Sequence, residues 1–330
     1  MSDIAAMLSE SLKSSLNLRL MSYYLLAFVL FFIAFGIVFS ALGIVAMTVY
    51  WVFGIQEISI AIFAIIVLVG IILLYYANAV LHGLFLLLAR DFIGTGKLSF
   101  SEALNNALQR ANTLFAANVL ISVFFLIIFI ILMMPAVLPL LGALQQLSPL
   151  ALFEPQALVS LFLPVVLTAL AMIAVFFIFL FLISPFTFLV APVIVFESLS
   201  VFGGIRKAFN VTRQNYLQNL LAVLVFIVVV VIISFFSSAM QFVLNLLVSF
   251  VPLLGLLFLL VLFAFELFVV LFSTAFQSVF LLNYYKANCG AFVPAPKPKK
   301  KEKPKAEEPI MPSESETKTV KLEPWMGKRI

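Results

Sequence analysis

The stretch FGGIRKAFNVTRQNYLQNLL, residues 202–221, is a polar and basic segment between two apolar runs of membrane-spanning length. At helical spacing, one face of it carries Ile205, Ala208, Phe209, Thr212 and Tyr216. The basic side chains Arg206, Lys207 and Arg213 lie outside that face, so the segment is predicted to form an amphipathic helix. Such a helix before a span is typical of the membrane interface, where its basic side meets anionic headgroups or a partner. The alternative is an anchor that only fixes the depth of the next span.

The apolar runs belong to a chain that is 65% hydrophobic and 10% charged. Water-soluble domains are about 45–50% apolar and about 25% charged, so we expect lipid to surround most of this chain. The chain has one cysteine, Cys289, and one histidine, His82. These counts argue against a disulfide and against metal sites built from several cysteines or histidines. The sequence also shows no phosphate loop, nucleotide fingerprint or catalytic dyad, so we expect no enzyme, no catalytic residue, no metal and no cofactor.

Six apolar runs each exceed the about 20 residues that cross the hydrocarbon core of a bilayer. They cover residues 23–53, 58–89, 114–142, 157–196, 217–250 and 252–285. The fourth run contains three prolines and is the one that we expect to be broken or bent. The Pro-rich stretch 135–155 is expected to lie in the interface or to re-enter the membrane, rather than to extend the third span.

All 19 Lys and Arg residues fall on one side of this arrangement. They lie in the N-terminal segment, in the loops after the second and fourth spans, and after the sixth span. The loops on the other side carry only Glu57 and Glu154 as charged residues. Because Lys and Arg are enriched in cytoplasmic loops, the sequence predicts a multi-pass protein of the cell membrane with both termini in the cytoplasm.

The basic segment before the fifth span has two fainter copies. Residues 9–12 align with residues 101–104, Ala107-Leu108 aligns with Ala208-Phe209, and Asn118 aligns with Asn219. Each copy leads into two spans, so all copies share one orientation and read as parallel repeats about the membrane normal. The sequence therefore predicts an all-α membrane protein of three parallel repeats, each led by a cytoplasmic-side amphipathic helix. The expected parts are an N-terminal amphipathic helix at 1–22 and a six-span bundle at 23–286 with amphipathic helices near 99–113 and 200–216.

Residues 189–226, LVAPVIVFESLSVFGGIRKAFNVTRQNYLQNLLAVLVF, combine Pro192 near the end of one span, Glu197 just after it, and the basic segment. This combination resembles a loose family of multi-span archaeal and bacterial proteins of unknown function, similar to the membrane domain attached to some glycerophosphoryl diester phosphodiesterases. The resemblance implies a six-span helical bundle over most of residues 1–290. It implies no activity, because the sequence holds no counterpart of the phosphodiesterase catalytic domain, whose histidine-dependent chemistry cannot run on His82 alone.

Four polar side chains are predicted to lie inside the membrane: Glu266, His82, Asn118 and Asn219. A carboxylate in lipid costs about 2.5 kcal/mol or more on insertion scales, so Glu266 should face the bundle or be protonated. It is the candidate for a proton, cation or polar-substrate site, and the alternative is a hydrogen bond to a neighbouring helix. For His82 and the two asparagines, hydrogen bonding between helices is the favoured interpretation over a substrate pathway.

The composition changes at residue 287. Residues 287–330 are rich in proline and lysine and poor in apolar side chains, so this cytoplasmic tail is predicted to be disordered. Its lysine cluster, which suits anionic lipid or another polyanion such as ribosomal RNA, includes Lys297, Lys299, Lys300 and Lys301. Trp325 and Met326 are apolar side chains in this polar segment and are candidates for docking a cytosolic partner. The alternative is a tail that serves only topology and solubility.

These features favour a non-enzymatic integral membrane protein that organises lipid or recruits partners at the cytoplasmic face. Its expected partners are membrane lipids and, through the tail, a cytosolic protein or the ribosome. Two alternatives stay open. One is a transporter or lipid-moving protein that uses the bundle and Glu266. The other is a membrane-protein biogenesis factor whose tail contacts the ribosome.

Overall fold

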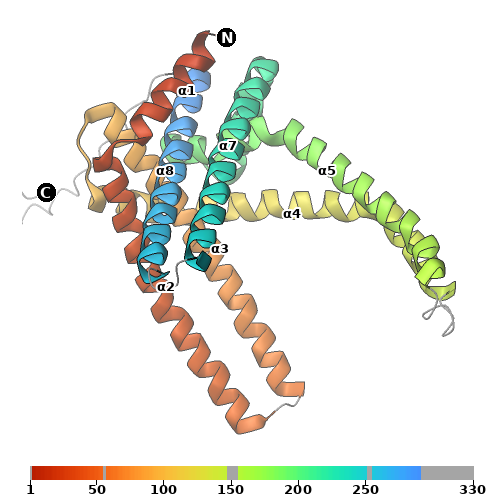
Figure 1. Ribbon diagram of the computed structural model, residues 1–330. Helices are drawn as coiled ribbons and strands as arrows, with labels where there is room; N and C mark the ends of the chain where they lie inside the picture. Colours follow the sequence, from red (N-terminus) through yellow and green to blue (C-terminus); the bar gives the residue numbers. More distant parts are fainter. Residues whose placement is uncertain (1, 55–56, 147–154, 251–254, 291–330) are drawn as a thin grey trace, which may run out of the picture. The chain divides into compact units, whose positions relative to one another are not determined.

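The computed structural model of the chain describes residues 2–54, 57–146, 155–250 and 255–290. Those residues form eight α-helices and no strand, which confirms the all-α fold class. In chain order the helices are α1 (Ser2–Ser15), α2 (Leu18–Phe53), α3 (Glu57–Thr95), α4 (Phe100–Gln146), α5 (Pro155–Glu197), α6 (Val201–Gln214), α7 (Tyr216–Phe250) and α8 (Gly255–Cys289), as Figure 1 shows.

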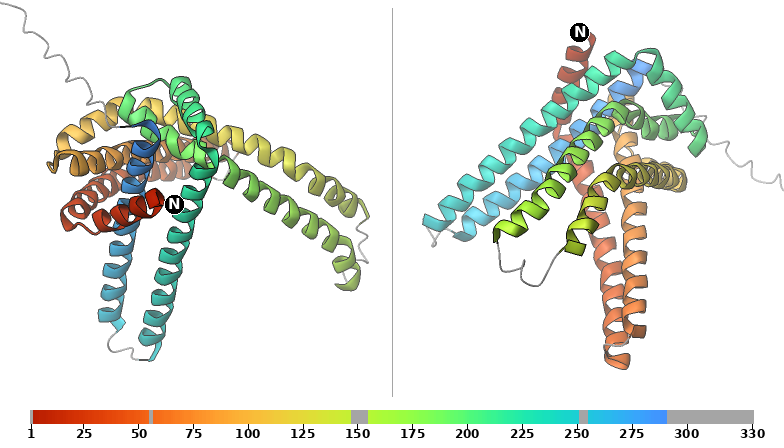
Figure 2. Two further views of the ribbon diagram at one scale, coloured as in Figure 1. Left: turned by 90° about the horizontal axis from the view of Figure 1, so that it is seen from above. Right: turned by 90° about the vertical axis from the view of Figure 1, so that its right-hand side faces the viewer.

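Six of these helices, α2, α3, α4, α5, α7 and α8, are long and apolar enough to cross a bilayer. Consecutive long helices pack in pairs, α2 with α3, α4 with α5 and α7 with α8, and the two members of each pair lie side by side in Figure 2. A helix satisfies its backbone hydrogen bonds internally, which lipid requires because it offers no partners. The prediction of a six-span, multi-pass helical protein is confirmed at this level.

Two of the polar segments before the spans form separate short helices. The Asn17 side chain caps α2 by accepting from the backbone N–H groups of Arg19 and Leu20, at 3.0 and 3.4 Å, and so separates α2 from α1. Ser200 caps α6 in the same way through the Gly203 N–H, and α6 ends before Asn215. The segment predicted near 99–113 is instead the first part of α4, which continues into the span without a break.

Prolines inside the third and fourth runs do not interrupt their helices. Helix α4 continues through Pro135 and Pro139 to Gln146, so the expectation that residues 135–146 leave the span is wrong; residues 147–154 lie outside the described part. Helix α5 is likewise continuous through its three prolines. Each proline removes one backbone bond. Leaving the helix would unpair several backbone groups in lipid, which costs more.

The packed core lies at one end of the long helices. Here the last turns of α3, α5 and α8 contact each other and meet the beginnings of α2, α4 and α7. Leu84 of α3, Ile194 of α5 and Phe280 of α8 are almost fully buried in this cluster. We call it the basic end, because every Lys and Arg of the described residues lies in or beside these helix termini.

Candidate functional site

Three short segments at the basic end precede the three helix pairs, and each packs on the last turns of another pair. Helix α1 contacts α8, the beginning of α4 contacts α3, and α6 contacts α5. Each segment buries a row of small side chains at helical spacing: Ser11 and Ser15 in α1, Ala103, Ala107 and Ala111 in α4, and Gly204, Ala208 and Thr212 in α6. We call these three the leader segments. Small residues allow helix backbones to approach closely, as in other membrane helix contacts.

The closest of these contacts joins α6 to α5 at Gly204. A Cβ atom added to Gly204 would lie 2.5 Å from Cγ1 of Ile194. The leader segment of α4 meets α3 in a similar way, since a Cβ on Gly83 would lie 3.0 Å from Cδ1 of Leu114 and 3.7 Å from Cβ of Ala107. Packing of this kind fixes which side of each leader segment faces the core and which side stays outside.

Glu197 joins three helices at the end of α5. Its carboxylate accepts hydrogen bonds from Nζ of Lys207 in α6 and, at 2.8 Å, from the hydroxyl of Tyr285 in α8. The sequence identified Glu197 and Lys207 as parts of one motif, and the structure places them in one ion pair. Lys207 is also one of the three headgroup contacts predicted on α6, and its ammonium already has a protein partner. The role of Tyr285 was missed, because its contact with Glu197 spans 88 positions of sequence.

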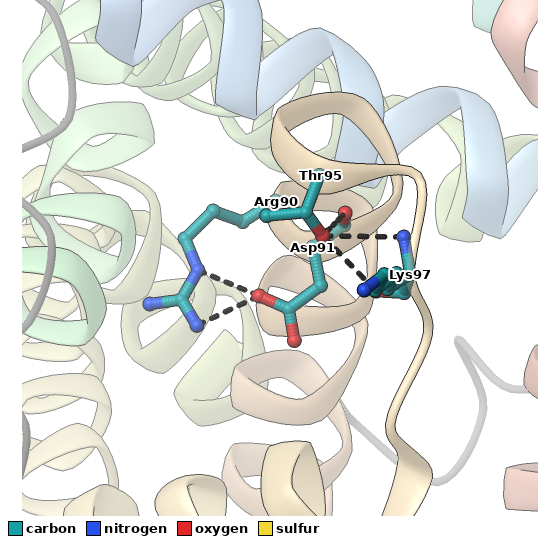
Figure 3. Close-up of polar contacts among 4 residues, drawn as sticks. All are labelled: Arg90, Asp91, Thr95 and Lys97. Carbon is teal, nitrogen blue, oxygen red and sulfur yellow. Dashed lines mark hydrogen bonds and ion pairs between the residues drawn. The ribbon is translucent and has the colours of Figure 1, made fainter.

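A second polar group closes the end of α3. Figure 3 shows the Arg90 guanidinium directed at the carboxylate of Asp91, with Nε and Nη2 at 3.0 and 2.8 Å from Oδ1. The hydroxyl of Thr95 donates to the Asp91 carbonyl and accepts from the Lys97 backbone N–H, which shapes the turn after α3. These contacts organise the end of α3 and the turn that follows it.

Arg206 and Arg213 are exposed on α6. The described part of the chain has two ion pairs, Arg90 with Asp91 and Lys207 with Glu197, and neither involves these two arginines. An exposed guanidinium can bind a phosphate by two parallel hydrogen bonds, which gives it geometric selectivity as well as charge. Among the described residues, Arg206 and Arg213 are therefore the predicted headgroup contacts whose charge is available to bind a phosphate.

The four predicted intramembrane polar side chains are not brought together. Glu266 of α8 accepts a hydrogen bond of 2.6 Å from the Gln241 amide of α7. Asn219 is buried and donates to the Thr212 carbonyl at 3.4 Å. The Nε2 atom of His82 is buried without a hydrogen-bond partner in the structure, and Asn118 is half-buried on α4. They lie in separate contacts and form no shared polar path.

Sequence reasoning missed the polar contacts that surround Pro185. A proline leaves one helical carbonyl without its usual N–H partner, and the hydroxyl of Ser184 donates to that carbonyl, on Phe181, at 2.6 Å. One turn later the Pro185 carbonyl accepts from Thr212 and Tyr284, both at 3.4 Å. The proline was the available signal for the Ser184 contact only, because it predicts an unpaired carbonyl four residues earlier. The contacts of Thr212 and Tyr284 had no such signal, because the proline does not remove the helical donor of its own carbonyl.

Two apolar grooves flank α5 beside α6. The first, of about 590 Å³, lies between α4, α5 and α6 and is lined by Leu120, Ile121, Val123, Phe124, Phe125, Ile127, Ile183, Phe186, Thr187, Val190, Ile205 and Phe209. The second, of about 420 Å³, is lined by Phe179, Leu182, Ile183, Phe186, Arg213 and Tyr216. We call them the α4 groove and the Arg213 groove. They share Ile183 and Phe186 as a common wall, and only the Arg213 groove has a charged side chain in its lining.

Within the described ranges, no three His, Cys, Asp or Glu side chains come together as a metal site would require. The tail residues that the sequence singled out, namely Lys297, Lys299, Lys300, Lys301, Trp325 and Met326, lie outside those ranges. Fold and site together define a multi-pass, all-helical membrane protein with its packed core at the basic end. Comparison with protein-family models, with curated proteins and with solved structures finds no match to the chain.

Proposed function

We propose that this chain is a non-enzymatic integral membrane protein that organises anionic lipid, and recruits partners, at the cytoplasmic face of a cell membrane. The leader segments form its lipid-contact surface, and the tail extends that surface with further lysines. Both termini lie in the cytoplasm in this proposal, as the one-sided distribution of Lys and Arg indicates.

The observation that carries this proposal is the direction in which α6 is buried. Gly204, Ala208 and Thr212 face the core, while Arg206 and Arg213 are exposed on the same helix. The arginines are therefore directed at whatever surrounds the basic end. In a membrane, the headgroup layer surrounds this end of the protein. There each Lys or Arg adds roughly 1 kcal/mol of attraction to an anionic leaflet.

A threefold repeat is part of the proposal, and the order of helix contacts supports it. If each repeat is a leader segment and two spans, the leader of the first packs on the last span of the third, α1 on α8. The leader of the second packs on the last span of the first, α4 on α3, and that of the third on the last span of the second, α6 on α5. This cyclic order is what three parallel repeats about one axis require. The proposed relation to the family of multi-span archaeal and bacterial proteins rests on Pro192, Glu197 and the basic segment that follows them.

The first alternative, a transporter that uses Glu266, has less support than the proposed function. The Gln241 amide gives the Glu266 carboxyl a neighbour on the adjacent helix, and this contact favours a role in joining α7 to α8. For the second alternative, a biogenesis factor, the whole argument depends on the tail and its lysines.

Mass spectrometry of bound lipids and co-purifying proteins tests the proposal. The protein would be purified in mild detergent both as the full chain and cut after Ala291, together with a variant carrying Arg206→Gln and Arg213→Gln. We expect the full chain and the cut form to retain anionic lipids over zwitterionic ones, and the double variant to lose this preference. A full chain without any preference for anionic lipid contradicts the proposal. If ribosomes or a protein partner co-purify with the full chain but not with the cut form, the main function belongs to the tail.

A further inference from the structure

We infer that the basic end holds one anionic glycerophospholipid in a specific site beside α5, with its phosphate on Arg213 and its two chains in the Arg213 groove and the α4 groove. This inference rests on the proposed function and deepens it. The proposed function requires only a general attraction of anionic lipid, whereas a specific site requires one residue and one groove.

The apolar part of the site is preorganised. The Phe186 ring stacks between Phe209 of α6 and Tyr216 of α7, with ring centroids 4.9 and 5.7 Å apart. The hydroxyl of Tyr216 donates to the Leu182 carbonyl at 2.7 Å and holds its ring in place. The wall that the two grooves share is therefore fixed by three helices, and a bound chain need not order it.

The size and lining of the grooves fit lipid chains. The α4 groove, of about 590 Å³, lies within the roughly 300–1,000 Å³ of binding sites for small molecules. The Arg213 groove beside it is shallower and more open. Both linings are almost entirely apolar, and most of their residues lie on membrane-spanning helices, where the surrounding solvent is hydrocarbon. Two grooves on either side of Phe186 match a ligand with two chains joined at one polar end.

The polar end of the site is Arg213. Lys207, on the same helix, is already paired with Glu197, whereas no ion pair of the described residues includes Arg213. Arg213 is the charged side chain in the lining of the second groove, where it lies with Tyr216. A guanidinium at the mouth of an apolar groove complements a phosphodiester that continues into apolar chains. This charge complementarity selects a phospholipid over a peptide or a second copy of the chain.

The test measures how many phosphatidylglycerol molecules remain bound. Full-length protein would be reconstituted into vesicles of equal amounts of phosphatidylglycerol and phosphatidylcholine, extracted in mild detergent and weighed intact by native mass spectrometry. We expect one phosphatidylglycerol to survive extraction. Arg213→Gln should weaken its retention about tenfold, as expected for the loss of a charge-assisted hydrogen bond, and Arg213→Lys should restore part of it. Lys97→Gln is the control, because it removes one positive charge at the basic end from an exposed position outside the leader segments and outside both grooves, and it should leave the bound lipid in place.

A second pair of variants tests the grooves without changing charge. Ile183→Trp should fill the shared wall and expel the lipid, whereas Ile178→Trp, at an exposed position of the same helix outside both linings, should not. Equal losses in Lys97→Gln and Arg213→Gln, with normal retention in Ile183→Trp, would overturn the specific site while leaving the proposed function intact. Loss of a dimer in Ile183→Trp would show that a second copy, not lipid, covers the grooves. If the unaltered protein retains both lipids equally, the inference and the proposed function fail together.

Discussion

The two halves of α8 are both apolar, but only one of them is packed. None of residues 257–270 is buried, whereas most of residues 271–285 are. Phe263 and Phe280 illustrate the difference, because the first is 68% exposed and the second is fully buried. The same division recurs in α3, where most of the buried positions fall in residues 77–89 and residues 60–69 carry none. Hydropathy alone thus keeps a helix in the membrane, and the tertiary structure depends on the half at the basic end.

The largest difference in stability between the two halves of α8 should appear when a buried aromatic ring is removed. Phe280→Ala is expected to lower the free energy of unfolding by about 3–5 kcal/mol, the range for large-to-small changes in packed cores. Phe263→Ala, on the same helix, should change it far less, because lipid can fill the space that the ring leaves. Titration with sodium dodecyl sulfate, followed by tryptophan fluorescence or proteolysis, measures both. Equal losses in the two variants would contradict the division of α8 into a packed and an unpacked half.

Gly204 tests the close contact of a leader segment with the core. Gly204→Ala should destabilise the protein by about 1–3 kcal/mol through overpacking against Ile194. In Gly36→Ala nothing lies within 4 Å of the new methyl group, so the gain in helix propensity of about 0.5–1 kcal/mol should prevail. Adding Ile194→Ala to Gly204→Ala should relieve part of the clash. The same detergent titration should show a loss of stability for Gly204→Ala and a gain for Gly36→Ala. Changes of the same sign in the two variants would contradict the close contact between α6 and α5.

The Glu197 group should contribute less, because its ion pair is partly exposed. We expect Tyr285→Phe to cost about 1 kcal/mol, the net value of a typical hydrogen bond. Lys207→Met should cost at most about 1 kcal/mol, as for other partly exposed ion pairs. Arg206→Met removes the same charge from the same helix and is the control. A double-mutant cycle between Glu197→Met and Tyr285→Phe isolates their coupling, and zero coupling would remove Glu197 as a link between α5 and α8.

The smallest effect is expected for the polar contact between Gln241 and Glu266, away from the packed core. Hydrogen bonds between membrane helices average about 0.6 kcal/mol in double-mutant cycles. The cycle of Gln241→Leu and Glu266→Met, in which each change removes one partner of the hydrogen bond, should give a coupling of that size. A coupling of several kcal/mol would show that the exposed half of α8 also stabilises the tertiary structure. The two halves of α8 would then not differ in the way described above.

The sequence predicted the six spans well, because their length and apolar character are local properties. It could not predict the position of the core. Phe263 and Phe280 have the same hydropathy, and only the neighbouring helices decide which of them is buried. The rows Ala103, Ala107, Ala111 and Gly204, Ala208, Thr212 were the available signal, since small residues spaced by four predict close helix contacts.

The candidate site was predicted in part. The basic segment was found because charged residues stand out between apolar runs, and Glu197 was found beside it. The grooves were not found, because Phe186, Phe209 and Tyr216 come from three helices and converge only in the folded chain. Tail residues such as Trp325 stay predictions.

The contact between α1 and α8 sets the earliest moment during synthesis at which α1 can pack. The amide of Asn283 donates to the hydroxyl of Ser11 at 3.2 Å, across 272 positions of sequence. At about 5–20 residues per second, a ribosome needs roughly 15–55 s to make the chain between them. Throughout that interval, α1 lacks the surface of α8 on which it packs. Nascent chains arrested before α8 should therefore expose the Ser11 face of α1 to protease or to a chaperone, and lose that sensitivity when the last span is released.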